Sequence, residues 1–416
     1  MVSLLEITYE YLESLRYVRE IRRRMELGEY TDILALIGAR RVGKTFMLLK
    51  KARELLDSGK QVIYASLDEP FLRKMDVRKF AELVRKDYPH GRVYLFLDEI
   101  QEWENWDFNL RWLHDVKDFR IYVSGSSSTL MSSEIPKRLR GRYISKILYP
   151  LSFRELVDFE VRTFRERGRI LRLLEEYLKW GGFPEVWLQR SREKIISLLE
   201  TIFFKDIIER FNIENIEIFK SVFYFTLSNY SNLISYRSIN RILKSMGVDI
   251  DVKTLINYIG YMKQAFLVYT LEIFSYSQRS RIVNPRKLYV IDVSFSNLFP
   301  ETLDIGRKIE NLVFIELLRR SSPFTDISYY RTKGREEVDF LVRERGYVKD
   351  LIEVTYEVQQ SHVKKMFKAL NELKIKRGTI ITWAEEDVID IKDKCIEVVP
   401  LWKWLLKPSA RDESIE

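Results

Sequence analysis

Residues 38–45 have the types and the spacing of a loop that binds phosphate groups. Their sequence, Gly-Ala-Arg-Arg-Val-Gly-Lys-Thr, fits the pattern G-x-x-x-x-G-K-[ST]. The glycines let backbone N–H groups wrap around phosphate oxygens, Lys44 supplies positive charge at the outer phosphates, and the Thr45 hydroxyl can hold Mg²⁺. The pattern predicts a site for ATP and Mg²⁺, formed by Gly38, Ala39, Arg40, Arg41, Val42, Gly43, Lys44, Thr45 and Phe46.

Two acids, Asp98 and Glu99, follow the apolar run at residues 93–97. An acid after a buried strand is common as the start of a loop, but with the phosphate loop upstream it indicates a Walker B motif. We expect Asp98 to hold Mg²⁺ and Glu99 to orient or deprotonate an attacking water, because transfer of phosphate to water requires a positioned nucleophile. Lys44 and Glu99 are therefore candidate catalytic residues.

A third apolar run ends in small hydroxyl residues, Ser124-Gly125-Ser126-Ser127. Ligands of open α/β sheets bind at the carboxyl ends of the strands, so Ser126 is a candidate sensor of the γ-phosphate. An ordinary serine-rich loop is the alternative. Arg138, Arg140 and Arg142 follow, and we expect one of them, Arg142, to face a phosphate within its own chain or in a neighbouring molecule.

The elements that must position these side chains are short apolar runs alternating with helical stretches. The pattern predicts a parallel α/β sheet with strands at residues 33–37, 62–66, 93–97 and 121–124 and a helix from Thr45. Apolar residues at helical spacing also predict an amphipathic helix over residues 4–27, with a solvated basic face at Arg19, Arg22, Arg23 and Arg24.

These motifs together resemble one family. The phosphate loop, the continuation Leu97-Asp98-Glu99-Ile100-Gln101, the run Leu139-Arg140-Gly141-Arg142 and the element Gly181-Gly182-Phe183-Pro184-Glu185 look like archaeal and bacterial AAA-type ATPases. In that family a C-terminal domain of unknown function resembles PD-(D/E)XK nucleases. The resemblance covers nearly the whole chain. It implies a P-loop core related to AAA+ and STAND proteins, followed by a helical lid and a winged helix.

The length of 416 residues favours two to three domains. We place a P-loop ATPase core at 1–150, a helical lid at 151–230, a winged-helix domain at 231–284 and an α/β restriction-endonuclease-like domain at 285–416. Ser152-Phe153-Arg154-Glu155 predicts a capping box that opens the lid. One Cys and three His exclude a disulfide framework and a Cys/His zinc cluster. No apolar run reaches membrane-spanning length, so we expect a cytoplasmic protein without membrane contact.

The net charge of +9 hints at a polyanionic partner. Residues 235–247 predict a helix closed by glycine, and a second helix carries Leu255, Ile259 and Met262 on one stripe. Residues 265–274 have β character and are candidates for the wing. Between residues 235 and 281 seven Lys and Arg stand against three Asp and Glu. This charge suits double-stranded DNA, while packing between domains, with Tyr258 and Tyr261 as packing groups, is the alternative.

Three acids in the C-terminal part lie on a predicted helix and two predicted strands. In the PD-(D/E)XK pattern Asp339 and Glu353 would hold Mg²⁺ with help from Glu310, and a lysine two residues after Glu353 would polarise water. That position is Thr355, which cannot supply the charge. We therefore favour a structural or docking role over an active nuclease, and expect that neutralising Asp339 and Glu353 has little effect on the fold. Lys364 or Lys365 could reach the site.

The leading hypothesis is an ATP-dependent switch that hydrolyses ATP and passes the nucleotide state to the later domains, with DNA association as its output. One rival is a metal-dependent nuclease gated by ATP. Another is a signalling or assembly protein that acts through protein partners or self-association. Metal-dependent cleavage of DNA would support the first rival, and absence of DNA affinity the second. A small-molecule kinase is less favoured because no second phosphate-binding motif is apparent.

Overall fold

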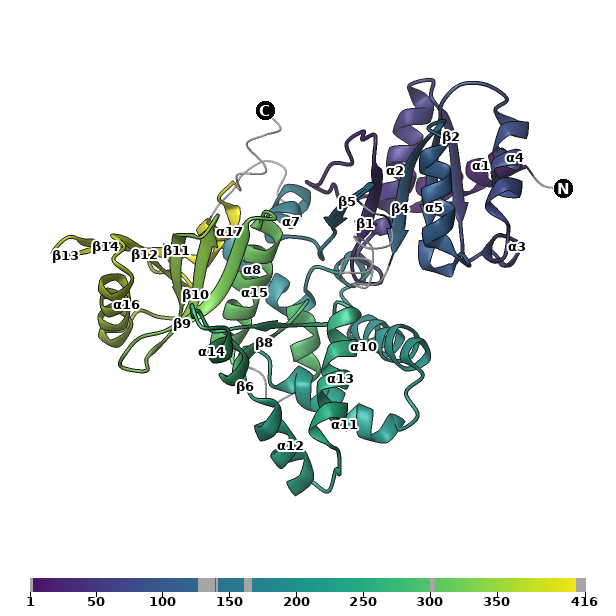
Figure 1. Ribbon diagram of the computed structural model, residues 1–416. Coiled ribbons are helices and arrows are strands. Elements are labelled where there is room, and N and C mark those ends of the chain that lie inside the picture. Colours follow the sequence, from purple (N-terminus) through teal and green to yellow (C-terminus); the bar gives the residue numbers. More distant parts are fainter. Residues whose placement is uncertain (1–2, 126–138, 140, 161–166, 300–303, 409–416) are drawn as a thin grey trace. The chain divides into compact units, whose positions relative to one another are not determined.

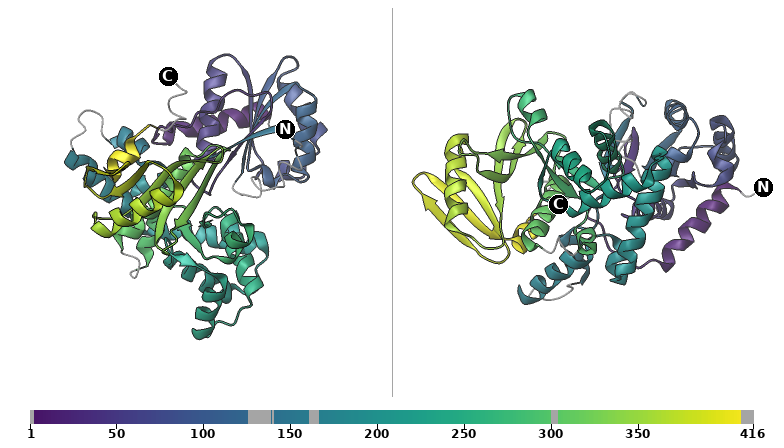
Figure 2. Two further views of the ribbon diagram at one scale, coloured as in Figure 1. Left: turned by 60° about the vertical axis from the view of Figure 1, so that its left-hand side comes forward. Right: turned by 90° about the horizontal axis from the view of Figure 1, so that it is seen from below.

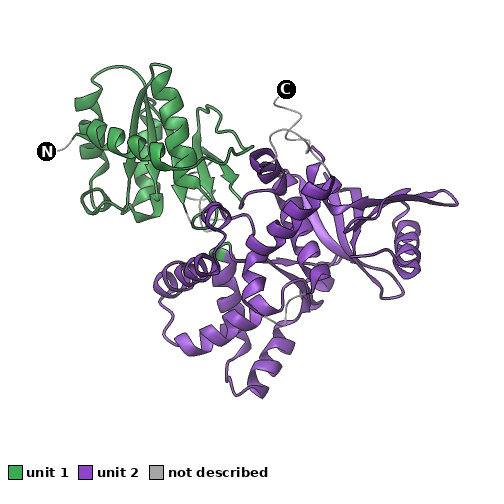
Figure 3. Cartoon of the chain, turned by 180° about the vertical axis from the view of Figure 1, so that it is seen from behind, with its two compact units in different colours: residues 1–149, 264–266 green, residues 150–263, 267–416 purple. Residues whose placement is uncertain are grey.

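The computed structural model describes residues 3–125, 139, 141–160, 167–299 and 304–408. The chain divides into two compact units (Figure 3). Unit 1 contains residues 1–149 and 264–266, and unit 2 contains residues 150–263 and 267–416. The three boundaries between the four domains expected from the sequence stay predictions.

Unit 1 is built on a five-stranded sheet with the order β2-β3-β4-β1-β5, in which all neighbours run parallel. Strand β1 is buried along its whole length, as its apolar sequence predicts. The predicted strands are confirmed, and β5 is an additional edge strand beside β1. The strands are β1 (Ile33–Ile37), β2 (Gln61–Ser66), β3 (Val93–Asp98), β4 (Phe119–Gly125) and β5 (Tyr143–Ile147).

Helices cover both faces of this sheet (Figure 1). Helix α2 packs on β2, β3 and β4, while α5 packs on β4 and on α4. Right-handed crossovers place α2 on one face and α4 and α5 on the other, because the chain moves across the sheet in opposite directions. The helices are α2 (Lys44–Asp57), α3 (Pro70–Arg73), α4 (Val77–Asp87) and α5 (Trp106–Asp115), with a 3₁₀ turn η2 (Ile100–Glu102) after β3.

The predicted helix over residues 4–27 is wrong in length. Helix α1 (Leu4–Ser14) is followed by one 3₁₀ turn, η1 (Leu15–Tyr17), and the arginine cluster lies beyond both. The Ser14 hydroxyl donates to the Tyr11 carbonyl, a local bond of the kind that competes with helical backbone bonds. Arg23 donates to the backbone carbonyl of Tyr149, so at least one arginine binds protein rather than forming a solvated face.

Unit 2 begins with helices, as predicted. The expected capping box is confirmed, since the Ser152 hydroxyl accepts from the Glu155 N–H and the Glu155 carboxylate accepts from the Ser152 N–H. The helices are α7 (Phe153–Glu160), α8 (Arg167–Trp180), α9 (Pro184–Gln189), α10 (Arg192–Thr201), the π-helix η4 (Ile202–Glu209) and α11 (Ile216–Ser228).

A helix pair and a small sheet follow in unit 2. Ser235 caps α12 (Tyr236–Ser245), Gly247 has a φ of +83° after it, and Leu255, Ile259 and Met262 are buried on α13 (Val252–Gln264). Both predicted helices are therefore confirmed. The antiparallel sheet has the order β6-β8-β7, from β6 (Leu233–Ile234), β7 (Val268–Leu271) and β8 (Arg286–Val290), with α14 (Gln278–Val283) between β7 and β8.

The C-terminal part of unit 2 is a mixed six-stranded sheet with the order β13-β14-β12-β11-β10-β9 (Figure 2). Helix α16 packs on β10, β11, β12 and β14, and its Met366 and Leu370 meet Val338, Leu341 and Ile396 in a buried core. The elements are η5 (Val293–Leu298), α15 (Ile305–Arg320), β9 (Thr325–Arg331), β10 (Glu337–Glu344), β11 (Tyr347–Val354), α16 (Gln360–Leu373), β12 (Arg377–Thr382), β13 (Asp387–Ile391), β14 (Lys394–Pro400) and α17 (Leu401–Leu406).

Within the described ranges, no helix combines the length and the apolar character needed to cross a bilayer.

Candidate functional site

The phosphate loop joins the carboxyl end of β1 to the amino end of α2, as its sequence predicts. Gly43 has a φ of +101°, a conformation that favours glycine. At Gly38 a Cβ would lie 2.3 Å from the backbone oxygen of Leu148, which follows β5. Both glycines of the motif are therefore required by the backbone path.

The loop side chains divide into buried and accessible groups. Ala39, Val42 and Lys44 are buried, whereas Arg41 and Thr45 are exposed. The Lys44 ammonium donates to the carbonyls of Gly38 and Ala39, at 3.1 and 2.9 Å from its Nζ. The loop thus holds its own lysine against its backbone, with the charge beside the place where phosphates are expected.

The Asp98 carboxylate accepts hydrogen bonds from three hydroxyl groups in other parts of unit 1. The Thr45 hydroxyl on α2 donates to Asp98 Oδ2 at 2.6 Å, and the Tyr64 hydroxyl on β2 donates to the same oxygen at 2.8 Å. The Ser124 hydroxyl at the end of β4 donates to Asp98 Oδ1. Because β4 lies between β1 and β3, the carboxyl ends of these strands bring the phosphate loop and the Walker B acid together.

Glu99 follows β3 in a left-handed backbone conformation, with a φ of +50° and a ψ of +52°. A non-glycine residue in this region is strained, and such residues cluster at functional sites. Its N–H donates to the Ser124 hydroxyl at 3.1 Å, and its Oε2 accepts from the Gln101 amide at 2.5 Å. Burial raises the pKa of Glu99, while the positive charge of Lys44 opposes this shift. A carboxyl with a raised pKa is better suited to accept a proton.

The structure does not group all the predicted residues. Ser126, Arg138 and Arg140 lie outside the described residues. Arg142 precedes β5 and its carbonyl accepts from the Ile33 N–H, at the amino end of β1 and so at the opposite edge from the phosphate loop. Its guanidinium pairs with Asp115 at 3.0 Å. Because β5 runs parallel to β1, this position favours a contact with a phosphate of a neighbouring molecule over one within the chain, and the role of Arg142 stays a prediction.

Sequence reasoning missed two contacts of the acids. Tyr64 contacts Asp98 from β2, and Gln101 contacts Glu99 from the turn after β3. Burial, followed by the charge of Asp98, raises the pKa of Tyr64, which keeps it a neutral donor. Tyr64 lies within β2, and nothing in its local sequence marks it as a contact of Asp98. Gln101, in contrast, belongs to the motif Leu97-Asp98-Glu99-Ile100-Gln101.

The predicted C-terminal acids, Glu310, Asp339 and Glu353, form ion pairs with lysines. Lys287 on β8 contacts Glu310, Glu337 and Asp339, and Lys365 on α16 contacts Glu353. Lys365 was one of the two lysines expected to reach the site. Burial and then the charge of Asp339 raise the pKa of Glu310 to about 7. In the part of the chain that the structure describes, no group of three or more acids, histidines or cysteines is arranged to hold a metal, and the possible second site at Glu310, Asp339 and Glu353 stays a prediction.

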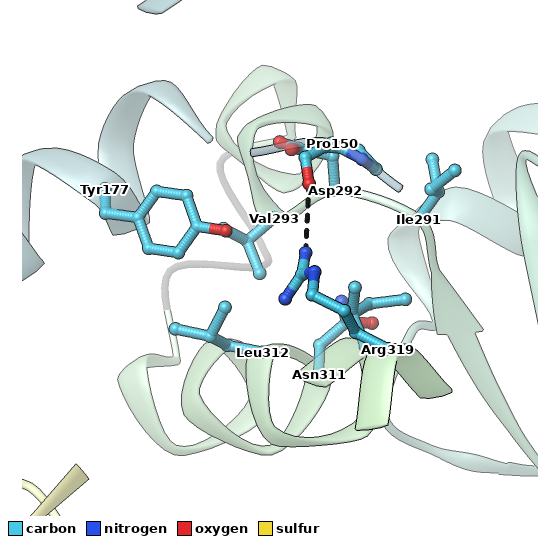
Figure 4. A pocket seen from close by; sticks show the side chains of 9 residues that line it. Pro150, Tyr177, Ile291, Asp292, Val293, Asn311, Leu312 and Arg319 are labelled. Carbon is cyan, nitrogen blue, oxygen red and sulfur yellow. Dashed lines mark hydrogen bonds between the residues drawn. The ribbon is translucent and has the colours of Figure 1, made fainter. Parts of the chain in front are cut away.

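A small cavity with a mostly apolar lining lies elsewhere in unit 2 (Figure 4). Its volume is 10 Å³, enough for about one water molecule. The Arg319 guanidinium, on α15, donates to the backbone carbonyl of Pro150 at 3.0 Å, and Tyr177 lies at the side of the cavity. Burial raises the pKa of Asp292, while hydrogen bonds from Ser294 and Gly182 oppose the shift. A cavity of this size holds no substrate, and its polar residues organise the fold.

Comparisons with known proteins divide the chain into three matched regions. Residues 30–157 match the AAA domain, residues 171–304 match a domain of unknown function (DUF8612), and residues 305–404 match another (DUF4143). The chain is 32% identical over 423 residues to the uncharacterized protein MJ1544 of Methanocaldococcus jannaschii, covering 96% of this chain and 94% of that protein. An uncharacterized protein of Haemophilus influenzae is 27% identical over 398 residues, covering 91% and 95%.

Solved structures show weaker similarity. The replication initiator DnaA bound to AMPPCP and single-stranded DNA is 17% identical and covers 62% of this chain and 87% of the DnaA chain, with a TM-score of 0.28. The structure of C. elegans PCH-2 is 10% identical and covers 46% and 68%, with a TM-score of 0.28. These scores are low, and no functional argument follows from them.

Proposed function

Because this chain belongs to the family of MJ1544 from Methanocaldococcus jannaschii and carries an AAA domain, we propose that it binds ATP at residues 38–46 and hydrolyses it to ADP and phosphate. The observation that carries the proposal is the contact between the Thr45 hydroxyl and Asp98, at 2.6 Å. A phosphate loop and a strand-end acid 53 residues apart meet at one edge of a parallel sheet. That arrangement suits phosphoryl transfer, in which positioning and charge supply most of the catalysis.

Lys44 and the loop backbone bind the phosphates in this proposal. The Lys44 ammonium would exchange its two carbonyl partners for phosphate oxygens, and its positive charge would attract the polyanion. The arginines Arg40 and Arg41 add positive charge to the same loop. Binding is therefore expected to depend most strongly on Lys44.

The residues present fit Mg²⁺. A hydroxyl and a buried carboxylate in direct contact are hard oxygen ligands of the type that this ion prefers. Thr45 and Asp98 would hold it, and the ion would neutralise charge on the phosphate oxygens. Tyr64 and Ser124 hold Asp98 in place through their hydroxyl groups.

Glu99 orients the attacking water and accepts its proton in this proposal. Its raised pKa, its strained backbone and its position beside Lys44 support that role. Gln101 restrains one carboxylate oxygen, which leaves the other to contact water.

Binding is tested first by substituting Lys44. We expect Lys44→Ala to weaken ATP binding by about 100-fold or more, because one charged hydrogen-bonding group is lost from a site for a polyanion. Fluorescence titration with a labelled ATP analogue in the presence of Mg²⁺ measures this effect. Lys50→Ala is the matched control, since Lys50 lies on the same helix but pairs with Glu20 on the surface. Equal affinity of Lys44→Ala and wild type would contradict the site.

DNA association is a second part of the proposal, and the surface of α12 supports it. Arg237, Arg241 and Lys244 are exposed on this helix at spacings of four and three residues, and so share one face. On α13 the exposed Lys253 lies near the amino end. We call Arg237, Arg241, Lys244 and Lys253 the basic face and propose that this segment is a winged helix that contacts DNA phosphates.

Two tyrosines of α13 pack inside unit 2. The Tyr261 ring stacks on Phe211 at 4.2 Å between centroids, and the Tyr258 ring meets Phe219 edge-on at 5.1 Å. These tyrosines are therefore packing groups, as the alternative interpretation expects. Packing involves one side of the segment and leaves the basic face exposed, so both interpretations are compatible with the same helix pair.

We expect affinity for duplex DNA to fall steeply with salt, by about 0.9 log units per log unit of salt for each phosphate contacted. Changing Arg241, Lys244 and Lys253 together to Ala should make the slope shallower and weaken binding to all sequences alike, because phosphate contacts carry no sequence information. Fluorescence anisotropy across a salt series measures both effects.

The control for that experiment changes three exposed basic residues on other helices of unit 2, Arg192, Lys205 and Lys220, to Ala. This triple variant should retain the wild-type slope. If the wild-type protein binds no duplex at low salt, with or without ATP, DNA association is excluded and action through protein contacts or self-association becomes the leading hypothesis.

A further inference from the structure

Lys287 is a buried lysine surrounded by carboxylates. Only 4% of its side chain is exposed. Its Nζ lies 2.7 Å from Asp339 Oδ1, 2.8 Å from Glu310 Oε1 and 3.0 Å from Glu337 Oε1. An ammonium group has three N–H donors and no acceptor. Glu310 and Asp339 accept hydrogen bonds from Lys287, and Glu337 adds an ion pair, so three carboxylates surround its charge.

The position of Lys287 follows from strand β8. Lys287 and Tyr289 are two residues apart and thus project from the same face of the strand. Both reach Glu310 Oε1, since the Tyr289 hydroxyl donates to it at 2.7 Å and its ring stacks on Phe314 of the same helix, α15. Strand β8 pairs with β6 and β7 on its two sides. Lys287 therefore belongs to the β6-β8-β7 sheet, and its side chain contacts Glu310 and Asp339.

The remaining oxygens of the cluster are mostly occupied by protein donors. Asp339 Oδ2 accepts from the Val354 N–H at 2.8 Å, so both oxygens of this carboxylate are engaged. Lys365 donates to Glu353 Oε1. Glu353 Oε2 is buried and has no hydrogen-bond partner among the described residues, so a cation bound at Glu353 is the alternative that an experiment must separate.

The two lysines together carry two positive charges, the same charge as one Mg²⁺ ion. We propose that the ammonium groups of Lys287 and Lys365 take the place of a divalent cation among Glu310, Asp339 and Glu353. The acids of the six-stranded sheet and of α15 are accordingly held together by internal ion pairs, and Lys287 joins them to the β6-β8-β7 sheet. It does not cleave nucleic acid with a metal ion.

This inference reverses one expectation from the sequence. Acids without partners would repel one another, and neutralising Asp339 and Glu353 would then leave the fold unchanged or more stable. With the lysines in place, removal of one carboxylate leaves a buried ammonium short of partners, which is strongly destabilising. Asp339→Asn is therefore expected to lower the melting temperature of the protein.

The test measures metal binding and thermal stability of the full chain without nucleotide. Wild type should show no Mn²⁺ binding that depends on Asp339, and no metal-dependent rise in melting temperature. Lys287→Ala should melt about 5 °C lower or more in EDTA. Adding Mn²⁺ should restore part of that loss, because the carboxylates then lack an internal counter-ion. Lys394→Ala is the matched control, since Lys394 is also buried but contacts the surface acid Asp393.

Several outcomes would overturn the proposal. Mn²⁺ binding by wild type that is lost in Asp339→Asn would show a working metal site, as would cleavage of plasmid DNA that needs Asp339. Equal melting temperatures of Lys287→Ala and wild type would show that the ion pairs of Lys287 do not stabilise the fold.

If Lys287→Ala does not fold, the double variant Lys287→Met with Asp339→Asn tests the ion pair by comparison with its two single variants. It removes one charge of each sign and should be more stable than the sum of its two single changes predicts. A strictly additive result would contradict the proposal.

Discussion

Glu99→Gln is expected to bind ATP as tightly as wild type and to hydrolyse it about 10²–10⁴-fold more slowly. The amide has the size of the carboxylate and retains an acceptor oxygen, so the left-handed turn after β3 and the N–H contact with Ser124 need not change. It cannot accept a proton from the attacking water. The substitution therefore removes water activation while leaving Lys44 and Thr45 in place to bind the phosphates.

Steady-state turnover and equilibrium binding, measured on the same preparation, check this prediction. Glu102→Gln is the control, because Glu102 lies three residues later and pairs with Arg73 at a partly exposed site. Its turnover should equal that of wild type. If Glu99→Gln turns over ATP at the normal rate, Glu99 is not the base, whatever the binding result.

The second large effect concerns stability and Gly182. We expect Gly182→Ala to lower the free energy of unfolding of unit 2 by about 3 kcal/mol. A Cβ at this position would lie 2.3 Å from the backbone oxygen of Leu151, so the two backbones must move apart. That movement would break the 2.6 Å bond from the Leu151 N–H to the Gly182 carbonyl. It would also break the 2.7 Å bond from the Gly182 N–H to the buried carboxylate of Asp292.

Urea unfolding followed by tryptophan fluorescence measures the loss, and Gly260→Ala provides the control. Gly260 lies within α13, and nothing lies within 4 Å of the position of its Cβ. Alanine there should raise stability by about 0.5–1 kcal/mol, since glycine is a poor helix former. Equal stability of Gly182→Ala and wild type would mean that the contacts of Gly182 with Leu151 and Asp292 do not support the fold.

The glycine-proline element also shows where sequence reasoning was strong and where it was weak. The sequence marks the glycines of this element, but it does not indicate that Gly182 binds Asp292, which lies 110 residues away. The same distance problem hid Lys287, which lies 52 residues before Asp339 and on a different sheet. Local patterns do not specify which distant side chain fills a buried site, because that depends on how the sheets pack.

Elements with strong local signals were predicted well. Strand β1 is apolar throughout, and the phosphate-loop motif requires a strand before it and a helix after it. The apolar stripe of α13, Leu255, Ile259 and Met262, is buried as expected. The edge strand β5 was not predicted, because its sequence Tyr-Ile-Ser-Lys-Ile is short and mixed in polarity and none of its residues is fully buried. Without β5 the sheet order was unknown, and so the position of Arg142 at the opposite edge from the phosphate loop could not be anticipated.

Hydrolysis of ATP at the phosphate loop is measured by the release of inorganic phosphate. The purified full chain is incubated with ATP and Mg²⁺, beside Lys44→Ala prepared in the same way. We predict multiple turnovers by wild type, and a rate for Lys44→Ala that equals the background without protein. A wild-type rate no higher than that of Lys44→Ala, from protein that binds ATP, would contradict the account.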